Sequence, residues 1–441
     1  MDNDEMRLEA LDLNQQGKTL LKLGKVEEAK EKFDKAIEID PMLMDSYKNY
    51  GDLYMQIEQF EDAKNSYKKA MLIEKSGLLY FLYGNACFMN DEDHEGLENY
   101  NLAINEGYDS DDMLFFMGLA YENMNENDLA LRFYQKACVK NPSKPEYMVK
   151  KIVVLIKLGM KDEALKTTDE LLERSPEIYD GYHIKTQLLM EYDRYDEAVK
   201  FAKKASDRFP EDPDLIYDYA KALSLNNKSE ESLKVIQQAK QMKYFEDSKR
   251  DFLFLEAELY AKKAQYDVAK EKLLECIAME TENVFDGEAR FMLMNFYIID
   301  KDYEKSLEQA NALVKNDAKD LYYHAGLYYR AFSLKNLGKT EEATHFYKEA
   351  SSIYRLYTLK NPIAIDVYLY RAMCMKDLEQ YDKALELLDF INSLDDQVAE
   401  IYTLKAEIYR ILGRKALEEE EMKKAFKLKP ELKELYESDG E

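Results

Sequence analysis

The side chains that could bind a metal or attack a substrate are few and scattered in this sequence. Thiols and imidazoles are common zinc ligands and catalytic nucleophiles or bases, and such sites need them at characteristic spacings. The chain has four of each, at Cys87, Cys138, Cys276 and Cys374 and at His94, His183, His324 and His345. No C-x-x-C pair and no H-E-x-x-H pair occurs. We therefore expect buried free thiols rather than a metal or redox site.

Motifs for phosphate binding and covalent catalysis are also missing. The sequence contains no glycine-rich phosphate loop and no G-x-S-x-G nucleophile turn. His94 lies in the acidic stretch DEDHE at residues 91–95. Weak cation binding is one interpretation of this stretch, but a solvated charged turn is favoured. The sequence thus predicts no catalytic residue, no metal site and no cofactor, and we expect that the protein is not an enzyme.

The charge balance argues against nucleic acid as a partner. Lysine plus arginine number 62 and aspartate plus glutamate 88, which gives a net charge of −26. No basic block is long enough to follow a phosphate backbone. The start, MDNDEMRLEA, lacks the pattern of a secretory signal, and no run of eighteen apolar residues occurs. We expect a soluble, cytoplasmic protein with no membrane partner.

The apolar residues follow a pattern that is first complete in residues 10–43. Two sets of three share the helical spacing i, i+4, i+7, namely Leu13, Gly17 and Leu20, then Ala29, Phe33 and Ala36. This spacing marks one face of an α-helix, so it predicts two short helices separated by a break at Gly24. Gly17 and Ala29 are small, so the helices can approach closely there, and the Phe33 ring fills the wider end. One such pair cannot bury both faces alone, so repeats should follow.

The pattern recurs along the chain. The small residue of the second helix returns at Ala29, Ala63, Gly96, Ala130, Ala164, Ala198, Ser232, Ala269, Ser306, Ala343 and Ala384. Repeats begin at residues 10, 44, 77, 111, 145, 179 and 213, and then at the more widely spaced residues 250, 287, 324, 365 and 399. All prolines lie between the predicted helices. Gly24, Gly159, Gly338 and Gly413 lie at the turn inside a repeat, where a left-handed residue ends a helix.

This pattern resembles the tetratricopeptide repeat (TPR), whose unit has about 34 residues. The resemblance covers residues 10–432 in about twelve repeats, although tryptophan is absent and Glu418 stands where the last repeat should have a small residue. It implies an all-α fold, a right-handed α-α superhelix (TPR solenoid) of antiparallel helix pairs. We expect a lead-in at 1–9, seven regular repeats at 10–246, five looser repeats at 247–432, and a C-terminal cap and acidic tail at 433–441.

In the tetratricopeptide-repeat family, the second, fifth, ninth and twelfth places of each first helix line a concave groove that binds peptides. Many of these places hold large apolar residues here, where a solvent-facing stripe would be polar. We predict a partner-binding groove at Phe81, Asn85, Phe88, Phe115, Leu119, Val149, Val153, Phe254, Phe291, Tyr328 and Phe332. The alternative left open is that these side chains bury one another as internal packing.

The second place is acidic in most repeats, at Asp45, Asp112, Glu146, Asp180, Asp214, Asp251, Glu288, Asp366 and Glu400. A carboxylate in the first turn of a helix gains roughly 0.3–1 kcal/mol from the helix dipole, so a structural role is favoured over a negative rail for a basic peptide. The row still attracts cationic partners. The carboxylate clamp of the family's co-chaperones is matched only in part, by Asn14, Lys18 and Asn49, with Leu78 and Leu82 at its cationic places.

These observations favour a non-enzymatic scaffold or adaptor for protein–protein interaction. It would bind an amphipathic or basic protein segment in an apolar, acid-flanked concave groove. The alternative is a peptide-sensing or chaperone-like regulator that acts through a partner protein. Residues 1–9 are too short for the helix-turn-helix of the family's bacterial transcription regulators, and the repeats leave no residues for a catalytic domain.

Overall fold

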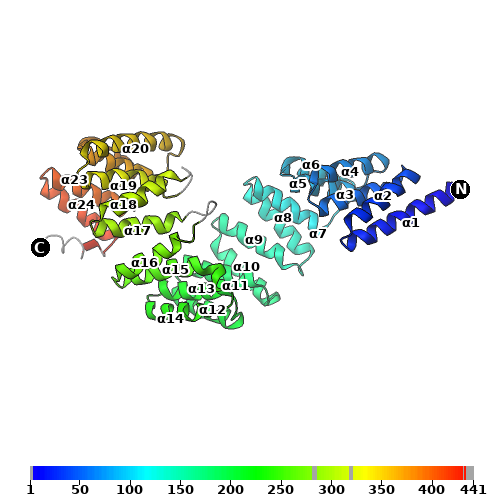
Figure 1. The fold of residues 1–441 in the computed structure, drawn as a ribbon, viewed down its shortest axis with the longest axis horizontal. Helices are drawn as coiled ribbons and strands as arrows, with labels where there is room; N and C mark the ends of the chain where they lie inside the picture. The colour runs from blue at the N-terminus through cyan, green and yellow to red at the C-terminus, as the bar shows by residue number, and fades with distance from the viewer. Residues whose placement is uncertain (1–2, 281–285, 317–320, 431, 434–441) are drawn as a thin grey trace. The chain divides into compact units, whose positions relative to one another are not determined.

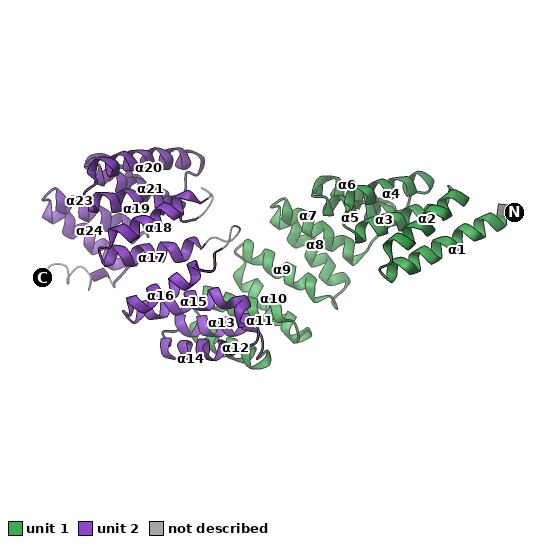
Figure 2. Cartoon of the chain, viewed as in Figure 1, with its two compact units in different colours: residues 1–209 green, residues 210–441 purple. Residues whose placement is uncertain are grey.

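The computed structural model describes residues 3–280, 286–316, 321–430 and 432–433, and every regular element in these ranges is an α-helix. Successive helices run back and forth as antiparallel neighbours (Figure 1). The chain divides into two compact units, residues 1–209 (unit 1) and residues 210–441 (unit 2), shown in Figure 2. Within the described ranges, no helix is long and apolar enough to cross a membrane. The predicted cap at 433–441 falls, apart from Lys433, outside the described residues.

Unit 1 is built from pairs of helices in which the second helix contacts the first. Its described helices are α1 (Asn3–Lys22), α2 (Val26–Ile39), α3 (Met44–Gln56), α4 (Phe60–Ile73), α5 (Gly77–Met89), α6 (Asp93–Asn105), α7 (Asp111–Asn123), α8 (Asn127–Lys140), α9 (Pro145–Lys157), α10 (Lys161–Arg174), α11 (Tyr179–Glu191) and α12 (Tyr195–Arg208).

Unit 2 continues the same alternation, with two longer helices, α15 and α20. Its described helices are α13 (Pro213–Leu225), α14 (Ser229–Ala239), α15 (Phe245–Lys262), α16 (Tyr266–Ile277), α17 (Gly287–Ile299), α18 (Tyr303–Lys315), α19 (Tyr323–Asn336), α20 (Thr340–Lys360), α21 (Ile365–Asp377), α22 (Tyr381–Leu394), α23 (Ala399–Ile411) and α24 (Lys415–Leu428).

In the first four helix pairs of unit 1, a glycine in the first helix lets the two helices of the pair approach closely. Four pairs share a glycine that faces an aromatic ring, namely Gly17 with Phe33, Gly51 with Tyr67, Gly84 with Tyr100 and Gly118 with Tyr134. A Cβ added at Gly17 would lie 2.5 Å from the Phe33 ring, which is too close for two carbon atoms. The close approach predicted at Gly17 is therefore confirmed.

Every pair has one left-handed residue at the turn after its first helix. The φ angles lie between 56° and 77°, at Gly24, Glu58, Asp91, Asn125, Gly159, Asp193, Asn227, Ala264, Lys301, Gly338, Glu379 and Gly413. Each is fifteenth in its predicted repeat, so the repeat frame and the four predicted glycine turns are confirmed. In the first pair, the N–H of Lys25 donates to the carbonyl of Leu20 at 3.0 Å and closes the end of α1.

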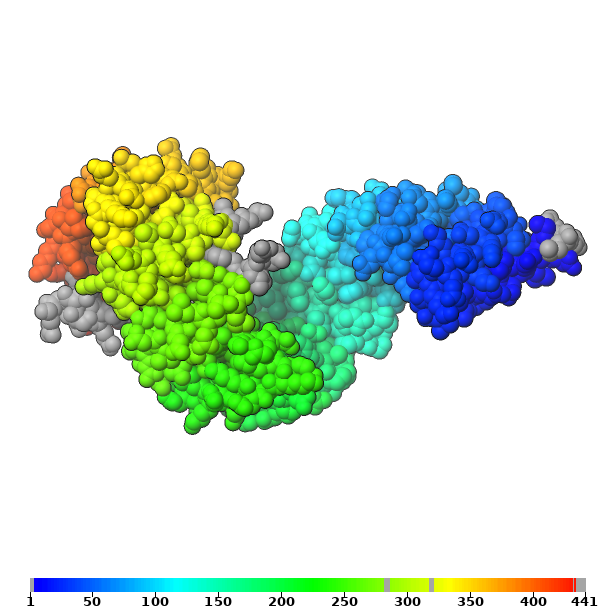
Figure 3. Space-filling view, viewed as in Figure 1, coloured from blue at the N-terminus to red at the C-terminus, as the bar shows by residue number. Residues whose placement is uncertain are grey.

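The core lies inside the pairs and between successive pairs. Ala63, Tyr67 and Ala70 of α4 pack against Leu79 and Tyr83 of the next pair, so each pair covers an apolar face of its neighbour. On the face shown in Figure 3, neighbouring segments within each unit lie directly against one another. The predicted fold class, an all-α superhelix of antiparallel helix pairs, is confirmed.

The compact units do not follow the predicted grouping of repeats. Unit 1 ends at Phe209, before α13, whereas the sequence places the change from regular to looser repeats between residues 246 and 247. Helix α1 already begins at Asn3, within the predicted lead-in at 1–9. The grouping of repeats by regularity remains a proposal.

Candidate functional site

The first helices of neighbouring pairs lie against one another and form what we call the inner face of each unit. In unit 1, α1 contacts α3 and α5 contacts α7. In unit 2, α13 contacts α15, and α17, α19, α21 and α23 contact one another in succession. All residues predicted for a partner-binding groove come from first helices of this kind, and each of them is buried or half-buried.

Phe81 of α5 is buried, with 8% of its surface exposed. Its ring centroid lies 5.1 Å from that of Tyr108, 6.1 Å from that of Tyr100 and 6.3 Å from that of Phe116. The Tyr100 hydroxyl also donates a hydrogen bond to Oδ1 of Asn85 at 2.8 Å. Side chains of the same and the following pair therefore engage two of the predicted groove residues.

A row of aromatic contacts continues along α5, α7 and α9. The ring centroid of Phe88 lies 5.9 Å from that of Phe116, and Phe115 lies 4.8 Å from Tyr147 and 5.6 Å from Tyr134. The other predicted residues of this region are half-buried, namely Leu119, Val149 and Val153. Much of the predicted surface in unit 1 thus packs between pairs.

The predicted residues of unit 2 are covered to different extents. Phe254 of α15 is 8% exposed and Tyr328 of α19 is 1% exposed. The Tyr328 hydroxyl donates a hydrogen bond to Oδ2 of Asp377 at 2.8 Å. Phe291 and Phe332 are half-buried. Phe254 and Tyr328 therefore present almost no surface to a partner, whereas the other two keep an accessible edge.

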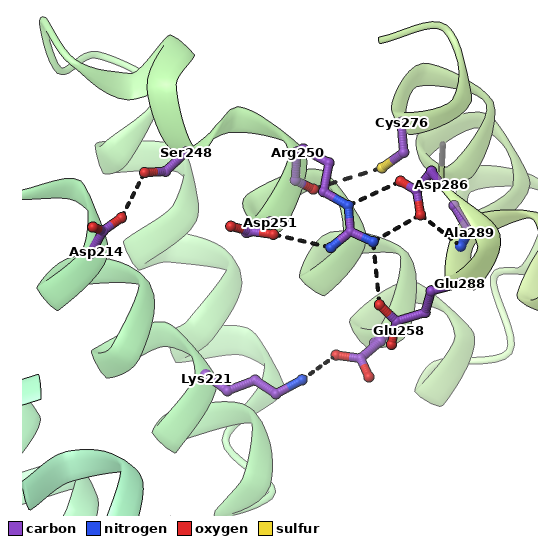
Figure 4. Close-up of polar contacts among 10 residues, drawn as sticks. All are labelled: Asp214, Lys221, Ser248, Arg250, Asp251, Glu258, Cys276, Asp286, Glu288 and Ala289. Atoms are coloured by element: carbon purple, nitrogen blue, oxygen red, sulfur yellow. Dashed lines mark hydrogen bonds and ion pairs between the residues drawn. The ribbon is translucent and has the colours of Figure 1, made fainter. Parts of the chain in front are cut away.

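Acids at the second place of the first helices bind groups at the start of the next helix pair. Asp112 of α7 forms an ion pair with Lys144 and accepts a hydrogen bond from the Tyr147 hydroxyl at 2.7 Å. Asp214 of α13 accepts a hydrogen bond from the Ser248 hydroxyl at 2.7 Å (Figure 4). The structural role favoured from the sequence thus includes contacts between successive helix pairs, which helix-dipole reasoning does not reveal.

Arg250 of α15 joins three carboxylates (Figure 4). Its Nε and Nη2 donate to the two oxygens of Asp286 at 2.9 and 2.8 Å, and other N–H groups donate to Asp251 at 3.0 Å and Glu288 at 3.2 Å. Asp286 also accepts the backbone N–H of Ala289 at 3.0 Å, which caps α17. Burial opposes the ionisation of Asp286, but the Arg250 hydrogen bonds outweigh it and lower the pKa of this carboxyl. This network fixes the start of α17 against α15.

The asparagines that match part of a carboxylate clamp bind each other. The Nδ2 of Asn49 donates to Oδ1 of Asn14 at 2.9 Å, and both side chains are buried. They join α1 to α3. Because both side chains are buried and bond to each other, the pair is a structural element of unit 1.

Cys87, Glu92 and Glu95 have ligand atoms within 4.8 Å of one another, close enough to hold a metal ion. The Lys64 ammonium forms an ion pair with Glu92 and lies 4.0 Å from Glu95, so a cation already neutralises these carboxylates. Burial raises the pKa of the Cys87 thiol to about 12, which keeps the sulfur protonated near neutral pH. The arrangement therefore favours an ion pair over a metal centre. All cysteines are free, and the expected burial holds for Cys87, Cys276 and Cys374, whereas Cys138 is half-buried.

A cavity of about 340 Å³ opens on the inner face of unit 2, between α19, α21 and α23. We call it the α21–α23 pocket, and its lining residues are Tyr329, Asp366, Leu369, Tyr370, Met373, Glu400, Thr403, Leu404 and Glu407. The residues from α21 and those from α23 have the same spacing, i, i+3, i+4, i+7. This spacing defines one face of a helix, so the pocket lies where equivalent faces of two successive first helices meet.

The walls of the α21–α23 pocket are largely apolar and aromatic. The ring centroid of Tyr370 lies 6.4 Å from that of Tyr329 and 6.2 Å from that of Tyr354 on α20. Leu369 and Met373 are half-buried beside it. Because Tyr370 packs against rings from two other helices, this wall is held in place before any ligand arrives.

Three carboxylates line the same pocket. Lys429 donates to Oε1 of Glu400 at 2.5 Å, and Lys376 donates to Oε1 of Glu407 at 2.7 Å. Burial opposes the ionisation of Glu400, but the hydrogen bond from Lys429 lowers the pKa of this carboxyl below its ordinary value. The side chain of Asp366 has no hydrogen-bond or ion-pair partner among the described residues. The pocket thus combines apolar walls with a negative rim.

None of the pocket residues is among the eleven predicted for the partner-binding groove, but Asp366 and Glu400 belong to the predicted row of second-place acids, and the repeat frame reaches most of the others. The second, fifth and ninth places of the repeats beginning at 365 and 399 are Asp366, Leu369, Met373, Glu400, Thr403 and Glu407. The sixth places of three successive repeats supply the rest, Tyr329, Tyr370 and Leu404. In α19 the predicted fifth-place residue, Tyr328, is buried, and its neighbour Tyr329 lines the pocket instead.

Comparison with protein families finds the same repeat. Sequence models described as tetratricopeptide repeat match residues 10–42, 45–76, 98–243 and 399–432, together more than half of the chain. A curated relative, the BBSome complex member BBS4 of Bos taurus, is 26% identical over 125 residues. That alignment covers 28% of this chain, and the chain spans only 23% of the relative.

Two solved structures with a similar fold cover different shares of this chain. YrrB, described as a TPR protein with an unusual peptide-binding site, is 23% identical with a TM-score of 0.37 and covers 42% of this chain and 96% of its own. Yeast Tom70 is 14% identical with a TM-score of 0.49 and covers 93% of this chain and 96% of its own. Neither likeness bears on what this chain binds.

Proposed function

Because this chain belongs to the tetratricopeptide-repeat family, we propose that it is a scaffold or adaptor that binds a segment of a partner protein on the inner face of unit 2. Proteins of this family generally mediate protein–protein interactions, and the family is generally non-catalytic. The observation that carries the proposal is the α21–α23 pocket, which brings apolar walls and polar rim groups together on one inner face. Binding pockets commonly have this composition.

The inner face of unit 2 is preferred because much of the predicted groove in unit 1 is used internally. Phe81 is surrounded by three aromatic rings, and Phe115 packs against two more. The half-buried residues of unit 1, such as Phe88 and Val153, keep some exposed surface. We propose that these half-buried residues of unit 1 form a second contact surface, which contributes less to partner binding than the pocket in unit 2.

The partner segment is expected to be amphipathic or basic. Apolar side chains match the pocket walls, and the negative rim together with the net charge of −26 attracts cations. The free thiols are consistent with a reducing, cytoplasmic compartment. In this proposal the chain positions a partner and supplies no catalytic group of its own.

Filling the pocket should abolish partner binding without unfolding the protein. Thr403 lies on the pocket wall and is half-buried, so Thr403→Arg places a long side chain inside the cavity. The matched control is Leu356→Arg on α20, where the leucine is 65% exposed. We expect a large loss of partner capture from native cell extract for Thr403→Arg alone, measured by quantitative mass spectrometry, with similar melting temperatures for both variants. Equal capture by both variants would remove the pocket from the proposed function.

A further inference from the structure

We propose that the α21–α23 pocket binds the cationic side chain of an arginine or lysine in the partner segment. This inference rests on the proposed function and specifies the chemistry of the same site. The pocket has an apolar lining and a negative rim with more carboxylates than paired lysines. An arginine or lysine side chain matches both parts, because its aliphatic stem ends in a cation.

The rim has more carboxylates than cations. Asp366, Glu400 and Glu407 line the cavity, and the lysines paired with them are Lys376 and Lys429. Each lysine bonds to Oε1 of its glutamate. With Asp366 unpaired among the described residues, the rim has carboxylate oxygens available for an incoming donor.

The apolar walls of the pocket suit the aliphatic stem of an arginine or lysine side chain. Leu369 and Met373 provide aliphatic surface, and the rings of Tyr329 and Tyr370 provide aromatic faces. Methylene groups pack on such surfaces, and a guanidinium or ammonium group is attracted to a tyrosine ring. The cavity of about 340 Å³ is at the small end of ligand pockets, which span roughly 300–1,000 Å³, so it fits one side chain with adjoining backbone.

Other side chains fit this pocket less well. An acidic side chain would meet three carboxylates, while Lys376 and Lys429 are already bonded. An uncharged apolar side chain could pack on the walls but would leave the Asp366 carboxylate without a partner. A cation both satisfies Asp366 and offsets the excess charge, so the observations favour it over the alternatives.

A pair of synthetic peptides tests the charge of the ligand. The probe is a fluorescein-labelled, amidated twelve-residue peptide of leucine, alanine and three arginines. The control peptide has citrulline in place of each arginine, because citrulline has nearly the same shape but no charge. Binding to the full chain is followed by fluorescence anisotropy at low and at moderate salt. We expect the arginine peptide to bind about tenfold more tightly than the citrulline peptide, as charge-assisted hydrogen bonds imply.

Charge-removing variants locate the site. Asp366→Asn combined with Glu400→Gln should weaken the arginine peptide about tenfold and leave the citrulline peptide unchanged. The control is Asp45→Asn combined with Asp180→Asn, which removes two exposed acids from the same helical place in unit 1. Melting temperatures of both double variants are recorded, so that unfolding is not mistaken for lost binding.

Several results would overturn the inference. These are equal binding of the two peptides to the wild-type chain, no binding of the arginine peptide, or equal weakening by the two double variants, which would indicate attraction by the net charge alone. In each case the comparison of Thr403→Arg with Leu356→Arg still judges the proposed function separately, because partner capture does not require a basic side chain. The proposed function fails on its own if those two variants capture partners equally.

Discussion

Phe81→Ala is expected to lower the free energy of unfolding of unit 1 by about 3–5 kcal/mol, because it leaves a cavity among tightly packed rings. Phe81 is 8% exposed, and Tyr108 stacks on it with a centroid distance of 5.1 Å. If Phe81 were instead a ligand residue, its truncation would weaken partner binding and change stability little. Urea unfolding followed by circular dichroism measures the difference.

Leu78→Ala is the matched control for Phe81→Ala. Leu78 lies one turn earlier on α5, also on the predicted groove stripe, but 40% of its surface is exposed. Its truncation should cost less than about 1 kcal/mol, in line with ordinary surface substitutions. Similar, small effects for both variants would contradict internal packing at Phe81 and restore the unit 1 groove as the leading site.

Asp286→Ala should destabilise unit 2 by about 2–4 kcal/mol, because it removes the main partner of Arg250 and the cap of α17. The Asp286 side chain is 5% exposed, whereas that of Arg250 is 37% exposed, so solvent and the remaining carboxylates recover part of the loss. Asp286→Asn keeps a capping oxygen but loses the charge, so we expect an intermediate effect. Urea unfolding at pH 7 would contradict this account if both variants matched the wild type.

The pH dependence of the same variants gives the sign of the Asp286 contribution. Its pKa is lowered in the folded state, so the stabilisation is fully present above the unfolded value of about 3.9 and is lost as the pH falls through the folded value. The stability advantage of the wild type over Asp286→Ala should therefore be complete above about pH 5 and shrink below about pH 4.

The helix pairs could be predicted from the sequence because local rules determine them. The i, i+4, i+7 spacing identifies the buried face of each helix, and the small residue at Gly17 predicts the contact with Phe33 that is observed. The left-handed turn is predicted where glycine occupies it, as at Gly24, but glutamate or alanine at Glu58 and Ala264 adopts the same conformation and gives no such signal. The repeat frame alone locates those two turns.

The accessible part of the inner face could not be predicted in the same way. Periodicity places a residue on a face, but exposure depends on what a distant side chain covers. Tyr328 is buried and bonds to Asp377, which lies 49 residues later in the chain, while its neighbour Tyr329 lines the pocket. The second-place acids were also identified from the sequence. Which of them are paired depends on the fold, because Glu400 bonds to Lys429 whereas Asp366 has no partner among the described residues.

Photo-cross-linking at methionine tests most directly whether partners bind at the α21–α23 pocket. Photo-methionine is close to methionine in shape and can replace it throughout the chain, so no pocket residue has to be changed in character. Met373 lines the pocket and is half-buried, whereas Met42 on the surface of unit 1 is 67% exposed. We predict that irradiation in native cell extract joins partner peptides to Met373 in preference to Met42, despite the lower exposure of Met373. Cross-links at Met42 with none at Met373 would contradict the account.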